Sequence, residues 1–163
     1  MALEELMMGT GLSPEAVVAL LAMLPVSELR GAIPVALGVY SMAPLKAYAI
    51  AVLGNVLPVV PLLLFLGPAE RSMRRIPQAN SFFEWLFART RRNAGEDIQR
   101  YGTLGLAIFV AIPLPATGAW TGTVVAYLFG LRFWRSFAAI CLGVLLAGVI
   151  VTLASLGFSF FVA

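Results

Sequence analysis

The chain has 163 residues, of which 61% are apolar and 12% are charged, whereas soluble domains contain roughly 45–50% apolar and about 25% charged residues. With a mean hydropathy of +0.95, this composition excludes an ordinary soluble domain and predicts an all-α integral membrane protein. Histidine is absent and Cys141 is the one cysteine. We therefore expect no enzyme, no metal site and no cofactor.

The first hydrophobic stretch is interrupted by charge. Glu28 and Arg30 separate two short uncharged segments, with Pro25 and Pro34 on either side. Each segment has the length of a half-helix rather than of a full span, which predicts a re-entrant hairpin. Ionisable groups at such a depth normally face a cavity or a partner.

A continuous uncharged run follows over residues 47–66 and is long enough to form a transmembrane helix. Asn55 lies inside it, as a lining residue or as part of an interhelical hydrogen bond. We assign residues 12–67 to a first repeat, a hairpin followed by a transmembrane helix.

Residues 68–102 form a polar connector that holds seven of the eleven basic residues. A basic block between two hydrophobic halves indicates a cytoplasmic loop, not a nucleic-acid site. A capping-box spacing and an apolar stripe predict an amphipathic helix at the membrane interface. The stripe consists of Phe82, Phe83, Leu86 and Phe87.

A second broken stretch follows over residues 103–131, and its centre contains Pro113, Pro115, Gly118 and Gly122. Prolines and glycines oppose a continuous helix and predict a second hairpin. If this hairpin re-enters, the basic residues after it stay beside the cytoplasmic connector, as the positive-inside rule favours. Residues 103–163 then form a second repeat, inverted relative to the first.

The two halves resemble each other at offsets of 87 to 89 residues. Arg30-Gly31-Ala32 parallels Thr117-Gly118-Ala119, and Ala-Ile-Ala-Val-Leu-Gly54 parallels Ala-Ala-Ile-Cys-Leu-Gly143. An internal repeat of this kind is typical of transporters.

Glu28 and Arg30 are the leading candidates for substrate binding or coupling. Arg30 offers a planar fork of donors to a phosphate or carboxylate, and Glu28 can bind and release a proton. A structural ion pair is the alternative, and it requires non-helical backbone, which Pro25 and Gly31 allow, because residues i and i+2 do not share a helix face.

In the second hairpin, neutral donors come from Thr117, Trp120 and Thr121, beside the partial positive charge of half-helix N-termini. The spacing of Gly118 and Gly122 is also that of close helix packing, within one subunit or between two.

Two stretches carry a family resemblance. Pro25-Val-Ser-Glu-Leu-Arg-Gly-Ala-Ile-Pro34 and Pro113-Leu-Pro-Ala-Thr-Gly-Ala-Trp-Thr-Gly122 resemble the signatures of the putative small multidrug export protein family. Ala116 stands where a glycine is expected. That family is distantly similar to the DedA/VTT membrane proteins, which implies paired re-entrant hairpins and movement of polyprenyl phosphate or phospholipid across the bilayer, with acidic and arginine residues in the hairpins.

We therefore predict a transporter in the cytoplasmic (inner) membrane that translocates a lipid-linked phosphate with proton or ion coupling. The alternatives are a proton-coupled exporter of cationic drugs and a non-transporting membrane assembly factor. The expected partners are membrane lipids, an anionic lipid-phosphate substrate and a second copy of the chain, because few helices are available to shield a charged midplane site from lipid.

Overall fold

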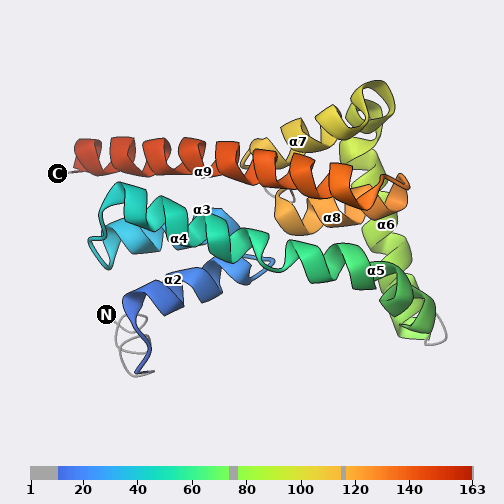
Figure 1. The fold of residues 1–163 in the computed structure, drawn as a ribbon, viewed down its shortest axis with the longest axis horizontal. Helices are drawn as coiled ribbons and strands as arrows, with labels where there is room; N and C mark the ends of the chain where they lie inside the picture. The colour runs from blue at the N-terminus through green and yellow to red at the C-terminus, as the bar shows by residue number, and fades with distance from the viewer. Residues whose placement is uncertain (1–10, 74–76, 115–116, 163) are drawn as a thin grey trace. The chain divides into compact units, whose positions relative to one another are not determined.

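The computed structural model describes residues 11–73, 77–114 and 117–162, and every regular element in these ranges is an α-helix (Figure 1). The all-α prediction is confirmed. In chain order the helices are α2 (Pro14–Met23), α3 (Glu28–Gly38), α4 (Pro44–Val56), α5 (Val59–Met73), α6 (Pro77–Tyr101), α7 (Thr103–Ala111), α8 (Ala119–Leu128) and α9 (Phe133–Val162).

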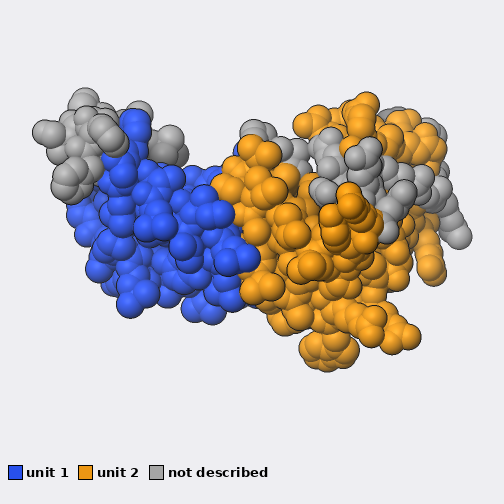
Figure 2. Space-filling view, turned by 90° about the horizontal axis from the view of Figure 1, so that it is seen from above, with its two compact units in different colours: residues 1–57, 145–163 blue, residues 58–144 orange. Residues whose placement is uncertain are grey.

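The chain divides into two compact units, coloured separately in Figure 2. The first unit comprises residues 1–57 and 145–163, and the second comprises residues 58–144. Helix α5 continues through Pro68 to Met73, so the sequence-based boundary between residues 67 and 68 falls inside a helix. A proline inside a helix removes one backbone hydrogen bond but need not end the helix when its surroundings hold the next turn.

In the first unit, α2 and α3 form a helical hairpin, called hairpin 1 (residues 14–38), and both helices pack against α4. Ser13 caps α2 by accepting a hydrogen bond from the backbone N–H of Ala16 at 3.3 Å. Each arm of the hairpin has 10 or 11 residues, or roughly 15–17 Å of helix, about half of a hydrocarbon core of about 30 Å. The hairpin lies where the sequence predicts one, and its re-entry into the bilayer remains a prediction.

Helices α2 and α4 approach each other closely at Gly54. A Cβ atom at this position would lie 2.6 Å from the carbonyl oxygen of Ala19 and 3.1 Å from the Cβ of Ala22. Since a backbone oxygen cannot rotate out of the way, only glycine fits at this crossing.

In the second unit, α7 and α8 form hairpin 2 (residues 103–128), which packs against α5 and α6. Gly102, with φ +55°, reverses the chain between α6 and α7. A Cβ at Gly143 of α9 would lie 2.7 Å from the carbonyl oxygen of Ala107 and 2.6 Å from the Cβ of Val110. The first arm of each hairpin is therefore held by a glycine of the helix that follows that hairpin in the sequence.

Helix α6 is amphipathic, as predicted, and Figure 1 shows it running crosswise to α5 and α8. Two residues of its apolar stripe pack inside the second unit: the ring centroids of Phe83 and Phe87 are 5.7 Å apart, and those of Phe87 and Tyr127 are 6.1 Å apart. The opposite face carries Trp85, which is 56% exposed, under the guanidinium of Arg89. Phe87 of the stripe thus contacts α8, whereas the sequence pattern predicts that the stripe faces the membrane interface. Tyr127 provides the aromatic partner, and the sequence of α6 alone does not reveal it.

Two stretches are long and apolar enough to cross a membrane, residues 44–72 and residues 133–158. The first stretch contains the whole of the uncharged run over residues 47–66, and the second lies in the part of the chain that follows hairpin 2.

Candidate functional site

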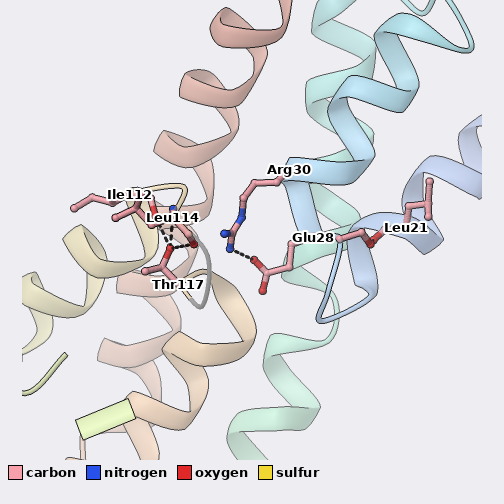
Figure 3. Close-up of polar contacts among 7 residues, drawn as sticks. Leu21, Glu28, Arg30, Ile112, Leu114 and Thr117 are labelled. Atoms are coloured by element: carbon pink, nitrogen blue, oxygen red, sulfur yellow. Dashed lines mark hydrogen bonds and ion pairs between the residues drawn. The ribbon is translucent and has the colours of Figure 1, made fainter. Parts of the chain in front are cut away.

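Glu28 and Arg30 meet at the turn of hairpin 1 (Figure 3). Glu28 is 4% exposed, and its Oε2 lies 3.3 Å from Nη2 of Arg30. The side chain of Arg30 is 29% exposed and that of Glu28 is 5% exposed. The carboxylate is therefore enclosed, whereas the guanidinium remains accessible.

The backbone of Glu28 makes this pairing possible. Its φ is +44°, a left-handed conformation that costs an L-residue other than glycine roughly 1–2 kcal/mol. This break lets residues i and i+2 meet at the start of α3. The sequence predicted non-helical backbone here, and the structure shows it at Glu28 itself and in the turn at Pro25.

Gly31 and Pro34 lie inside α3 rather than at its ends. A Cβ on Gly31 would be 2.7 Å from the Cβ of Ser27, so this glycine provides space rather than conformational freedom. The interpretation of Gly31 as a backbone break is therefore corrected, and the reason is the crowding of the turn against the first turn of α3.

Ser27 is a positioning residue that sequence reasoning missed. Its hydroxyl donates to the carbonyl oxygen of Leu21 across the turn (Figure 3), and its carbonyl oxygen accepts the backbone N–H of Gly31 at 2.8 Å. The backbone N–H of Glu28 donates to the carbonyl oxygen of Leu24 at 3.0 Å. These bonds hold the strained residue in place.

Asn55 lies in the last turn of α4 and is 1% exposed. Within the described part of the chain, no donor lies within hydrogen-bonding distance of its buried Oδ1. The sequence predicts Asn55 as a lining residue, and this remains a prediction. The structure adds that its side-chain oxygen has no hydrogen-bond donor among the described residues.

The sequence between α7 and α8 of hairpin 2 contains no charged residue. The hydroxyl oxygen of Thr117 accepts the backbone N–H of Leu114 at 3.1 Å and lies 2.6 Å from the carbonyl oxygen of Ile112 and 2.7 Å from that of Leu114. The hydroxyl is thus engaged within its own turn (Figure 3). We therefore expect Thr117 to stabilise the turn, and the role as a ligand donor that the sequence predicts is the alternative.

The other candidates of hairpin 2 lie around this turn. Pro113 is in the turn, whereas Pro115 lies outside the described residues. Gly118 has φ +121°, which is a glycine conformation, and it precedes α8. Trp120 and Thr121 are half-buried in the first turn of α8.

Gly122 packs within the chain. A Cβ at Gly122 would be 2.6 Å from Cγ2 of Val110 and 3.5 Å from Cγ1 of Ile140. Of the two interpretations that the sequence left open for Gly122, the structure favours close helix packing inside the second unit.

The second unit contains a buried carboxylate of its own. Glu70 of α5 is 3% exposed, and the hydroxyl of Tyr127 donates to its Oε2 at 3.3 Å. Gly67 makes room for the ring of Tyr127, because a Cβ there would lie 3.1 Å from Cε2. Sequence reasoning missed Glu70 because residues 68–102 were interpreted as a polar connector, and no local signal marks it as buried.

Within the described residues, no group of three His, Cys, Asp or Glu side chains could hold a metal ion. The chemistry visible at hairpin 1 is therefore that of one carboxylate and one guanidinium. Such a pair can exchange a proton and bind an anion.

Together, the apolar spanning segments and the charged turn of a short helical hairpin define a helical membrane protein. The sequence model of the family described as "Putative small multi-drug export protein" matches residues 28–150. The chain belongs to this family. Comparisons with curated proteins and with solved structures gave no match.

Proposed function

We propose that the protein is a multi-pass transporter of the inner membrane that moves the phosphate head group of a lipid carrier across the bilayer. Arg30 holds the phosphate, and Glu28 binds and releases a proton during the cycle. The observation that carries this proposal is the enclosed Glu28 carboxylate, held at φ +44° beside the more accessible Arg30.

The accessibility of the two side chains favours an anionic substrate. Arg30 presents positive charge, whereas Glu28 is almost fully enclosed. A guanidinium can bind two oxygens of a phosphate at once. The strain at Glu28 is also typical of functional sites, where surrounding contacts maintain an unfavourable backbone conformation.

The glycine contacts support two repeats. Gly54 and Gly143 align in the sequence and lie 89 residues apart, and the residues they contact, Ala19 with Ala107 and Ala22 with Val110, lie 88 residues apart. We propose that the hairpins re-enter the bilayer from opposite faces, which leaves both termini outside and residues 68–102 in the cytoplasm. The DedA resemblance remains a prediction.

The family description refers to multi-drug export, and the first alternative is a proton-coupled exporter of small cationic compounds. In that mechanism Glu28 alternately binds a proton and a drug. The accessible Arg30 opposes it, because a fixed positive charge repels a cation. A membrane assembly factor is the second alternative, and it requires no strained charge pair at a hairpin turn.

The experiment that tests the proposal uses the full chain in proteoliposomes. We expect it to translocate a fluorescent prenyl phosphate faster than protein-free vesicles and to leave a cationic dye untransported. Movement of the dye alone would support the exporter, and movement of neither would support the assembly factor.

The proposed association is a homodimer that shields the charged turn from lipid. Cross-linking in nanodiscs measures it, and a fully active monomer would contradict it. Single-cysteine labelling in a Cys141→Ala background tests the topology, which a cytoplasmic N-terminus would overturn.

A further inference from the structure

Asn55 has a buried acceptor that nothing within the described chain satisfies. The residue is 1% exposed, and its Oδ1 has no donor within hydrogen-bonding distance. Leaving a buried acceptor unpaired disfavours folding, because the acceptor loses its hydrogen bonds to water and gains none in return. Such a group in a native structure calls for an explanation.

The second repeat shows that packing does not require a polar residue at this place. Gly54 corresponds to Gly143, so Asn55 corresponds to Val144, which is 1% exposed. Valine therefore packs at the position after Gly143, which contacts α7 as Gly54 contacts α2. The carboxamide is specific to the repeat that carries Glu28 and Arg30.

Asn55 lies in the last turn of α4, and Glu28 begins α3. Because α3 and α4 pack against each other and are joined by the short segment 39–43, the end of α4 and the start of α3 lie at the same end of this helix pair. The neighbouring Gly54 contacts Ala22 of α2, and the adjacent residue Leu21 accepts the Ser27 hydroxyl of the turn. The described charged side chains of the first unit are Glu28 and Arg30 at this turn, and Glu15 and Lys46, which pair with each other at 2.6 Å.

We propose that Asn55 Oδ1 accepts a hydrogen bond from a protonated oxygen of the phosphate that Arg30 holds, and so selects phosphate monoesters over diesters. This inference rests on the proposed function. Arg30 provides donors for the anionic oxygens, and Asn55 provides an acceptor. A monoester that carries one proton offers both an anionic oxygen and an O–H, whereas a diester offers no O–H.

The test uses the full chain in detergent at pH 5.5, where most of a phosphate monoester carries one proton because its second pKa is about 6. Binding of farnesyl monophosphate is compared with binding of farnesyl methyl phosphate, a diester that has the same chain and no O–H. The variants are the isosteric pair Asn55→Val and Asn55→Thr, which differ by one oxygen. Thr123→Val is the matched control, since Thr123 is equally buried and bonds only to the carbonyl of Ala119 in its own helix.

We expect Asn55→Val to weaken monoester binding about tenfold, the effect of one hydrogen bond, while diester binding stays unchanged and the melting temperature does not fall. Asn55→Thr should retain part of the monoester preference, and Thr123→Val all of it. If Asn55→Val kept the wild-type preference for the monoester, this inference alone would be overturned. It would also be overturned if binding of both ligands weakened equally and the melting temperature fell. Absence of phosphate binding by the wild type would overturn the proposed function as well.

Discussion

The two hairpins share a plan of packing but differ in chemistry. In each, two short helices flank a turn, and the first arm lies against a glycine of the following helix, Gly54 or Gly143. Hairpin 1 places an ion pair at its turn, whereas hairpin 2 places there a hydroxyl engaged with its own backbone. The comparison teaches that similar helix packing can hold different turns in this chain, and it is the basis for our proposal that hairpin 1 binds the substrate.

The largest expected effect concerns the shared packing. We expect Gly54→Val and Gly143→Val each to prevent folding, because the new side chain meets a backbone oxygen at 2.6 or 2.7 Å. A backbone oxygen cannot move aside as a side chain can, so the cost exceeds the roughly 1–3 kcal/mol of ordinary overpacking. Yield of monodisperse protein and melting temperature measure this. Gly38→Ala is the control, since its Cβ meets nothing within 4 Å. Tolerance of valine at one glycine but not at the other would break the equivalence of the repeats.

The charge pair should give the next largest effect. Breaking a buried ion pair costs roughly 3–5 kcal/mol, and we expect the lower end because Arg30 is 29% exposed. Glu28→Gln should therefore lower the melting temperature, and the double change Glu28→Gln with Arg30→Gln should recover part of the loss. Recovery of stability together with transport would show that the pair is only structural.

Thr117 should give a smaller effect, on hairpin 2 alone. Thr117→Val removes the hydroxyl that accepts the N–H of Leu114, but this N–H also donates to the carbonyl oxygen of Ile112 at 2.8 Å. Because no donor is left unpaired and the turn is exposed, we expect a loss of less than roughly 1 kcal/mol. Melting temperature should fall slightly, with transport per folded molecule unchanged. A selective loss of transport at wild-type stability would instead assign Thr117 to the substrate.

The smallest expected effect concerns the exposed pair of Glu15 and Lys46. The hydrogen bond from Lys46 lowers the pKa of Glu15 below its ordinary value of 4.5. A lowered pKa stabilises the fold above the ordinary value, and this contribution is lost as the pH falls through the folded pKa. Lys46→Met should therefore reduce the melting temperature slightly at pH 7 and by less at pH 3. An equal reduction at both values would mean that the lysine stem, not the charge, contributes.

The positions of the helices could be largely predicted from local signals. Pro25 and Pro113 mark turns, and the uncharged runs mark spanning segments, because lipid imposes helical backbone and excludes charge. The sequence leaves open whether Glu28 and Arg30 pair with each other. The structure shows that they do, because Glu28 adopts a left-handed backbone conformation that no local sequence pattern predicts. Buried Glu70 and the inward apolar face of α6 depend on Tyr127, which is distant in sequence, so no local pattern contains them.

The most direct test of the central claim compares transport by Arg30→Lys and by Thr117→Val in the same proteoliposome assay with a fluorescent prenyl phosphate, normalised to folded protein. Lysine keeps the positive charge of Arg30 but cannot reproduce its two-pronged hydrogen bonding to a phosphate. The account predicts that Arg30→Lys loses most of the transport while Thr117→Val retains it. Full transport by a well-folded Arg30→Lys protein would contradict the account.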